Sequence, residues 1–475
     1  MIRALLTYFS LALVVQLGTG VLTKLVELVV LGDALSEHQF GEYQHYLLVL
    51  ELASGAFYFG FDHSLVTFIN KRKGNYRRFL RLFLAYALLL GALSGIAAFV
   101  ASRLTGFSST LAIGSVGLFV VAELGKLTFR ARMEKALELT LLALQSMIWS
   151  VGCGLGVLLR DRPANLAPGE EWVPTSLALW WAFAGFAVVA ALILAISAWR
   201  LSRSKDDLGP FRPFGPDYAA LWDDYRHLWL AGAAFVVNLR LVQVIVDASL
   251  GREALGRYGY VMSMMMFIHR PLALVQRAAL PLFTRHPDEV PRGFRQMVRL
   301  NLTLFPLVAI GMLGAFDLLL EYRSLSKYAD TWDYLAVIVS ASPMFTVEYL
   351  IATAAMARGL ARNTKRANVA ALFVNLPVTF ALVLSLGLWG AALAAAAYPI
   401  LFGILMLWFN RRDLPDFVAF ASVAVARSLV WLGIGIGLLF RMEDRILGAF
   451  AAAGIYLAGT AATGMWPLGP FRDRA

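Results

Sequence analysis

Ionisable side chains interrupt long apolar stretches of the sequence at helical spacing. Lys24 and Glu27 are three residues apart in the first stretch, and Glu51 and Asp62 are eleven apart in the second, so each pair shares one face of a helix. A charged group in apolar surroundings is costly unless it is paired or faces water. These two stretches therefore predict either buried ion pairs or one wall of a polar cavity.

Two stretches in the second half of the chain carry further charges. Arg240 and Asp247 are seven residues apart on one helical face, and His269 and Arg270 lie in the middle of the next stretch. Arg277 follows two turns later. Guanidinium groups bind phosphate oxygens bidentately, whereas an imidazole near its ordinary pKa of about 6.5 can act as a proton switch. The four stretches together predict a cavity lined by polar groups.

Two interpretations of these charges stay open. In the first, the cations form a cavity site, which would consist of Lys24, Arg240, Arg270 and Arg277. In the second, they neutralise each other between helices, Lys24 with Glu27 and Arg240 with Asp247 or Asp62. The candidates for ion pairing or for coupling to a transported ion are Glu27, Asp62, Asp247, His269 and Glu348.

The elements that position these residues must be helices that cross a membrane. Hydrophobic residues make up 59% of the chain and charged residues only 15%, whereas an ordinary soluble domain has about 25% charged residues. A span needs roughly 20 apolar residues. The sequence predicts an all-helical protein with about fourteen spans, at residues 8–31, 43–69, 79–102, 109–129, 136–159, 176–199, 227–250, 257–284, 296–320, 332–357, 367–386, 389–409, 418–440 and 446–465.

The charges of the connecting loops predict the orientation. Lys and Arg are concentrated in the termini and in every second loop, and cytoplasmic loops are the ones enriched in these residues. We therefore expect both termini in the cytoplasm. The net charge of +11 then reflects membrane topology, so no nucleic-acid partner is expected.

The chain also predicts two repeated lobes. Shifting the sequence by 215 positions aligns Gly41 with Gly256 and Tyr43 with Tyr258, together with many apolar positions of the helices on either side. A connection rich in Gly and Pro separates the two halves. The expected organisation is an N-terminal six-helix lobe at residues 1–205, a cytoplasmic linker at 206–226, a C-terminal six-helix lobe at 227–412, and two further helices with a short tail at 413–475.

Several kinds of chemistry have no support in the sequence. Cys153 is the single cysteine, so neither an internal disulfide nor a cysteine metal site is expected. The sequence has no GxxxxGK[ST] motif for holding ATP phosphates. No connection is long enough to fold into a catalytic domain. We therefore expect no enzyme activity, no metal and no bound cofactor.

At the repeated turns the chain resembles a transporter family. The segments Leu31 to Tyr43 and Asp247 to Tyr258, and the join Gly387 to Ala392, are similar to those of Wzx-type O-antigen and exopolysaccharide flippases. These belong to the multidrug/oligosaccharidyl-lipid/polysaccharide (MOP) superfamily. The resemblance implies two lobes around a central cavity that opens alternately to each side. It also implies transfer of undecaprenyl-pyrophosphate-linked oligosaccharide from the cytoplasmic to the outer leaflet of a bacterial inner membrane, for surface polysaccharide biosynthesis.

The resemblance gives the cations a role, which is to attract the lipid diphosphate. H⁺, Na⁺ or the membrane potential could drive such a carrier, and a polysaccharide polymerase or other assembly protein would be its partner, beside the membrane lipids. The first alternative is a drug or cation antiporter of the same superfamily, for which an acidic cavity is expected. The second is a membrane glycosyltransferase or polymerase, for which large outer loops are expected.

Overall fold

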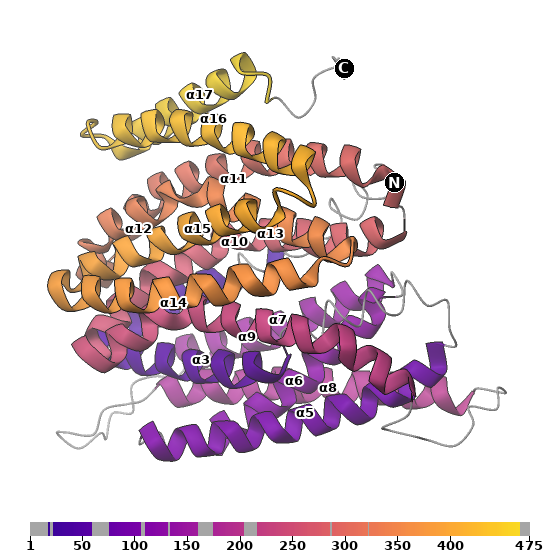
Figure 1. Ribbon diagram of the computed structural model, residues 1–475. Helices are drawn as coiled ribbons and strands as arrows, with labels where there is room; N and C mark the ends of the chain where they lie inside the picture. Colours follow the sequence, from indigo (N-terminus) through magenta and orange to yellow (C-terminus); the bar gives the residue numbers. More distant parts are fainter. Residues whose placement is uncertain are drawn as a thin grey trace, which may run out of the picture. The chain divides into compact units, whose positions relative to one another are not determined.

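The computed structural model describes most of the chain as helix. It covers residues 18–19, 22–58, 76–105, 110–131, 134–159, 174–203, 216–285, 287–321 and 323–465, and this part contains no β-strand (Figure 1). Within it, eight helices are long and apolar enough to cross a membrane, and a bent pair would make a ninth. The predicted class, an all-helical multi-pass membrane protein, is confirmed. The number of fourteen spans stays a prediction, because several spans extend beyond the covered residues.

The elements follow one another with short connections. Their bounds are η1 (Val26–Leu31), α2 (Gly32–Ala34), α3 (Glu37–Tyr58), α5 (Tyr76–Thr105), α6 (Thr110–Ala131), α7 (Lys135–Leu159), α8 (Pro174–Ser202), α9 (Pro216–Leu250), α10 (Arg252–Arg285), η2 (Pro287–Glu289), α11 (Val290–Leu320), η3 (Arg323–Tyr328), α12 (Thr331–Ser340), α13 (Ser342–Ala357), α14 (Ala361–Leu386), α15 (Leu388–Asn410), α16 (Pro415–Leu439) and α17 (Arg445–Ala462). Most begin and end within a few residues of the predicted spans.

Three elements differ from the apolar pattern for physical reasons. Helix α9 begins at Pro216, at the end of the predicted linker, because proline is favoured in the first helical turn and polar residues can continue a helix into water. The predicted span 332–357 is broken at Ala341 into α12 and α13, which meet at 45° beside Pro343. The end of the first span winds as a π-helical turn, η1.

The described chain forms two compact units. The N-terminal unit extends to Gly259 and the C-terminal unit begins at Tyr260, so the division falls inside α10. Each unit is described by itself below. The lobe boundaries expected from the linker stay a prediction.

In the N-terminal unit, α3 packs on α9 and α5, and α6 packs on both α5 and α8 (Figure 1). Small residues permit these close crossings: a Cβ on Gly91 of α5 would lie 3.0 Å from the carbonyl oxygen of Gly117 on α6. Farther along, Phe129 and Ile193 belong to an apolar cluster between α6 and α8. This packing fixes the axial positions of the helices that carry the charges.

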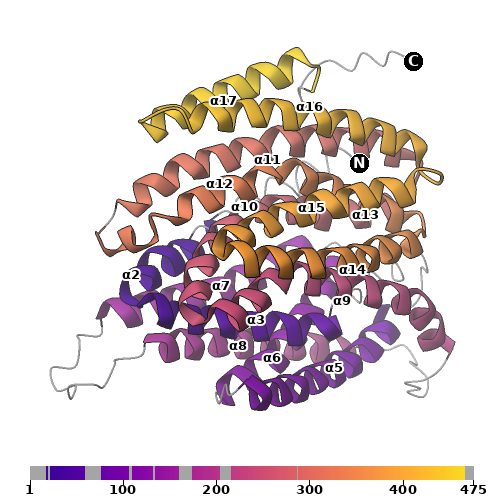
Figure 2. The same ribbon diagram turned by 60° about the vertical axis from the view of Figure 1, so that its left-hand side comes forward.

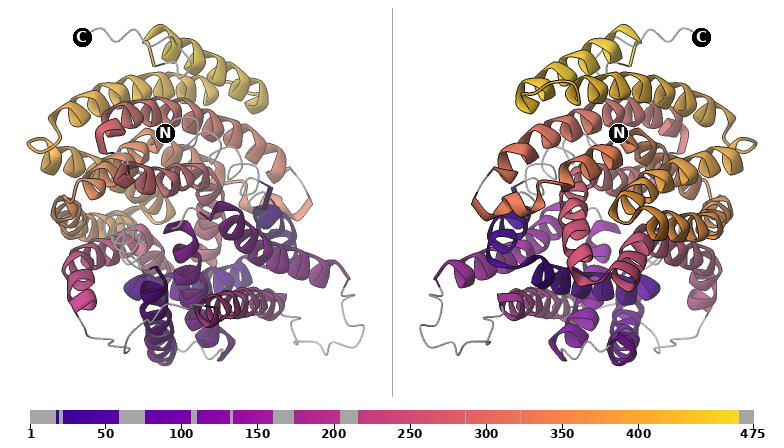
Figure 3. Two further views of the ribbon diagram at one scale, coloured as in Figure 1. Left: turned by 90° about the vertical axis from the view of Figure 1, so that its right-hand side faces the viewer. Right: turned by 90° about the vertical axis from the view of Figure 1, so that its left-hand side faces the viewer.

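In the C-terminal unit, α14 and α15 form a tight hairpin, and α16 and α17 lie along α11 (Figures 2 and 3). Gly387 turns the hairpin with a φ of 59°, a conformation that favours glycine. A Cβ on Gly390 would collide with the carbonyl oxygen of Leu382. The predicted join between the two helices at Gly387 is therefore confirmed, and both glycines are required by backbone geometry.

Candidate functional site

A row of polar contacts joins α3 to α9 in the N-terminal unit. His45 Nδ1 lies 2.8 Å from Asp247 Oδ2, and one and a half turns along α3 Glu51 forms an ion pair with Arg240. Because α3 and α9 run antiparallel, contacts that advance along α3 move back along α9. The next level is apolar and tight, since a Cβ on Gly55 would lie 2.7 Å from Val236 Cγ1. We call these contacts the α3–α9 seam.

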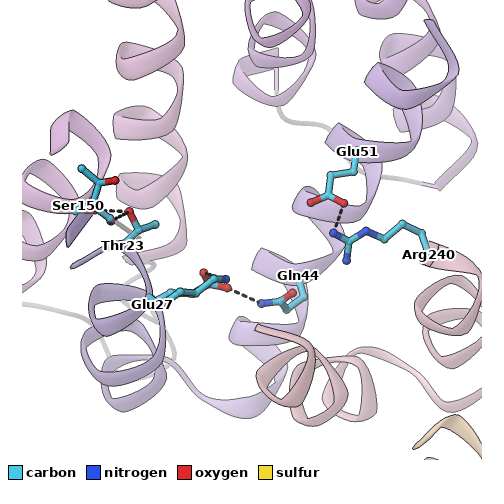
Figure 4. Close-up of polar contacts among 8 residues, drawn as sticks. Thr23, Glu27, Gln44, Glu51, Ser150 and Arg240 are labelled. Atoms are coloured by element: carbon cyan, nitrogen blue, oxygen red, sulfur yellow. Dashed lines mark hydrogen bonds and ion pairs between the residues drawn. The ribbon is translucent and has the colours of Figure 1, made fainter. Parts of the chain in front are cut away.

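Arg240 is the most buried arginine of the seam. The residue is 5% exposed, and its Nη1 donates a 2.7 Å hydrogen bond to Gln243 Oε1 one turn along the same helix. Nη2 pairs with Glu51, as Figure 4 shows. Nε is buried and has no hydrogen-bond acceptor among the described residues. The guanidinium is thus held on two sides and unsatisfied on the third.

A second charged group forms around the π-helical turn η1. Lys24 pairs with Glu27, and Gln44 Nε2 of α3 donates to Glu27 Oε1 at 3.3 Å (Figure 4). Nearby, the Ser150 hydroxyl of α7 donates to Thr23 Oγ1 at 3.1 Å. These contacts connect the first span to α3 and α7 through polar groups alone. The predicted pairing of Lys24 with Glu27 is present.

The structure assigns the remaining charges of the seam differently from the sequence-based alternatives. Arg240 pairs with Glu51, whereas Asp247 is held by His45 and by Arg252 Nη1, at 2.6 Å. Sequence analysis recognised Glu51 only as part of a charged stripe. The missed signal is register: Arg240 and Asp247 are seven residues apart, as are Gln44 and Glu51, so antiparallel helices can place one charge opposite each.

Near one end of the seam, the two glycines of the repeat meet. A Cβ on Gly41 would collide with the carbonyl oxygen of Arg252 and lie 3.2 Å from Gly256 N. A Cβ on Gly256 would collide with the carbonyl oxygen of Glu37 and lie 3.0 Å from Gly41 N. The contacts are reciprocal, because Glu37 and Arg252 are also 215 positions apart. The turns predicted to be equivalent by the repeat therefore pack on each other symmetrically.

An ion pair accompanies this crossing. Arg257 Nε donates to Glu37 Oε2 at 2.6 Å, so the first turn of α10 is fastened to the first turn of α3. Arg257 also lies 3.4 Å from Glu253 of its own helix. We call Glu37, Gly41, Gly256 and Arg257 the glycine crossing.

Several predicted site residues lie outside what the structure describes. Asp62 is not covered, and α10 includes His269, Arg270 and Arg277 without describing their side chains. Their assignment to the cavity stays a prediction. Of the predicted cations, the structure therefore places two, Lys24 and Arg240, in one unit and on either side of α3.

Glu348 lies apart from these residues, on α13 in the C-terminal unit. It is 2% exposed, and neither carboxylate oxygen has a hydrogen-bond partner among the described residues. The Tyr398 hydroxyl of α15 is also buried without a described partner, and it interacts electrostatically with Glu348. No group of three or more His, Cys, Asp or Glu suited to a metal ion occurs in the covered ranges.

Comparison with known proteins identifies the fold. No family model and no curated protein matches the sequence. Among solved structures, the lipid II flippase MurJ in an inward closed conformation has a TM-score of 0.64 at 12% identity, over 96% of this chain and 98% of that one. A MATE in complex with MaL6 has a TM-score of 0.64 at 13% identity, over 87% and 96%. A MOP superfamily transporter from Pyrococcus furiosus, described as having a binding pocket of reverse polarity, has 0.62 at 11%, over 92% and 96%. At these identities the likeness shows the fold alone, which is that of MOP transporters.

Proposed function

We propose that this chain is a flippase for undecaprenyl-pyrophosphate-linked oligosaccharide, moving it from the cytoplasmic to the outer leaflet by alternating access during surface polysaccharide biosynthesis. The observation that carries the proposal is Arg240, a buried guanidinium in mid-helix with one N–H unsatisfied among the described residues. Arginine at bilayer depth is rare and usually functional. Its planar fork matches the oxygens of a diphosphate.

The proposal extends to the residues around Arg240. Lys24 adds a second buried cation in the same unit, and Arg270 and Arg277 are expected to complete the cationic surface. The protein would act in a bacterial inner membrane with both termini in the cytoplasm. Its partners would be the lipid-linked substrate and a polysaccharide polymerase or assembly protein.

Glu348 supports an ion-coupled carrier. An ionised carboxylate without a partner is very costly in an apolar interior, so the group must either carry a proton or bind a cation. Exchange of that proton or cation, H⁺ or Na⁺, would couple transport to an ion gradient. The predicted coupling role of Glu348 is thus part of the proposal, whereas Glu27 and Asp247 are engaged in ion pairs.

Glu348 also favours the second candidate, a drug or cation antiporter. A carrier that exchanges a cation for a cationic drug requires an acidic group that alternates between them. This alternative predicts binding of organic cations and no dependence on Arg240. The flippase proposal predicts the reverse.

The test is complementation of a strain lacking the gene. We expect the deletion to accumulate lipid-linked oligosaccharide on the cytoplasmic face, measured by extraction and by accessibility to an impermeant probe. Wild type restores export at matched protein level, and Arg240→Ala does not. Arg200→Ala is the matched control, because Arg200 is also ion-paired in the N-terminal unit, with Glu134 at 2.8 Å, but is remote in sequence from the seam.

Two results would overturn the proposal. One is unchanged surface glycan in the deletion strain together with lost efflux of organic cations, which would establish the antiporter. The other is full export by Arg240→Ala, which would remove the observation on which the flippase proposal depends.

A further inference from the structure

The ion pair between Glu51 and Arg240 is asymmetric in its access to solvent. The Arg240 side chain is 6% exposed, whereas the Glu51 side chain is 35% exposed. The carboxylate therefore approaches the guanidinium from a side that is accessible, and the guanidinium itself lies behind it. Figure 4 shows this arrangement, with Glu51 extending from α3 toward Arg240 of α9.

The pair also leaves one edge of the guanidinium half used. Nε and Nη2 lie on the same edge, and their N–H groups point in parallel, so one anion with two oxygens can accept from both. Glu51 meets Nη2 with a single oxygen, and Nε has no acceptor among the described residues. Gln243 holds Nη1 on the opposite edge, which fixes the plane of the group. The geometry suits a ligand with two acceptor oxygens better than it suits Glu51.

We propose that Glu51 is an internal counterion that the substrate's diphosphate displaces from Arg240. The inference rests on the proposed function, since it assumes an anionic substrate. In the empty carrier, Glu51 neutralises Arg240 and so permits an arginine to be buried. When substrate arrives, two phosphate oxygens take Nε and Nη2, and the released carboxylate turns to the solvent that it already contacts.

This exchange gives Glu51 a role in selectivity and release. A ligand must compete with a carboxylate already in place, so a doubly charged, bidentate group binds, and a neutral lipid gains nothing at this position. After transport, Glu51 can reclaim the guanidinium and help to expel the diphosphate. A purely structural pair would only hold α3 to α9.

Binding measurements on the full chain in nanodiscs separate these roles. The probe is undecaprenyl pyrophosphate, with undecaprenol as the phosphate-free control lipid. We expect Glu51→Gln to bind the diphosphate roughly tenfold more tightly than wild type, because removal of a competing charge strengthens the remaining charge pair. Binding of undecaprenol should not change. Arg240→Ala should weaken diphosphate binding, and Glu51→Gln should give no gain in the Arg240→Ala background.

Glu51→Asp provides a second variant should Glu51→Gln fail to fold. It keeps the charge but shortens the reach to Arg240, so we expect affinity between those of wild type and Glu51→Gln. Unchanged or weaker diphosphate binding by a folded Glu51 variant would overturn the inference. An equal gain for undecaprenol would overturn it too.

The same measurements distinguish a failed inference from a failed function. If wild type binds the diphosphate and Arg240→Ala weakens it while the Glu51 variants bind no better, only the displacement is wrong. If wild type does not discriminate between undecaprenyl pyrophosphate and undecaprenol, the proposed function falls, and the displacement falls with it.

Discussion

The two units treat buried charge in different ways. In the N-terminal unit, each buried lysine or arginine that the structure describes, namely Lys24, Lys126 and Arg240, has a carboxylate partner. In the C-terminal unit, Glu348 is buried with neither oxygen hydrogen-bonded among the described residues. Paired charges can remain ionised in an apolar interior, whereas a lone carboxylate must gain a proton or a cation.

This difference suggests a division of labour. The N-terminal unit contains buried cations whose partners can be exchanged for an anionic substrate. The C-terminal unit contains an acid whose charge depends on a small cation. The following predictions test whether the two kinds of charge behave differently, beginning with the largest expected effect.

The largest effect is expected for Lys24→Met. This change removes the cation and leaves Glu27, which is 3% exposed, with Gln44 as its described hydrogen-bond donor. Breaking a buried pair from one side costs about 3–5 kcal/mol. Reversible unfolding in bicelles would measure the loss of stability. Glu27→Gln in the Lys24→Met background should recover part of it, and a loss below about 1 kcal/mol would show that the pair is not truly buried.

A smaller and symmetric effect is expected at the glycine crossing. Gly41→Ala and Gly256→Ala each place a methyl group against a backbone carbonyl oxygen of the other repeat. Overpacking of this kind costs about 1–3 kcal/mol. The two losses should be similar, because the contacts are reciprocal.

Gly433→Ala is the control for this pair. It places the same methyl group on α16, where no atom lies within 4 Å of the added carbon. Thermal unfolding of the three variants would measure the comparison. A large loss for Gly41→Ala with none for Gly256→Ala would contradict the symmetric packing.

An ion pair near the water is expected to matter less than those inside. Arg257 and Glu37 have side chains that are 33% and 16% exposed, so their pairing should contribute about 1 kcal/mol or less. A double-mutant cycle with Arg257→Gln and Glu37→Gln would measure the coupling energy. A coupling comparable to that of Lys24 and Glu27 would remove the distinction between the crossing and the buried pairs.

The sequence predicted the fold well because membrane spans are recorded in local composition. Helices α7 and α15 begin and end within one residue of the predicted spans. The start of α9 was missed because its first turns are polar, and the break at Ala341 was missed although Pro343 was a usable signal. The π-helical turn η1 has no comparable signal, since its residues are ordinary apolar ones and one glutamate.

The site was predictable only where partners are close in sequence. Lys24 with Glu27 and Lys126 with Glu123 were expected, because residues three apart meet on any helix. The partner of Arg240 depends on the register between α3 and α9, which no local pattern determines. The repeat carried one exception: the equivalence of Gly41 and Gly256 was visible in the sequence, and it identified two segments that the structure brings into contact.

The smallest effect on stability, and the sharpest test of the comparison, is expected for Glu348→Gln. The substitution keeps the shape and removes the capacity to ionise. If Glu348 is neutral in the resting protein, no ion pair is lost, so the free energy of unfolding should change by less than about 1 kcal/mol. Ion-driven transport should nevertheless fail, because the variant cannot exchange a proton or cation. Counterflow, in which substrate exchanges across the membrane without a gradient, should persist. Stability falling as far as in Lys24→Met would mean that Glu348 is ionised and paired, and the two units would then treat charge alike.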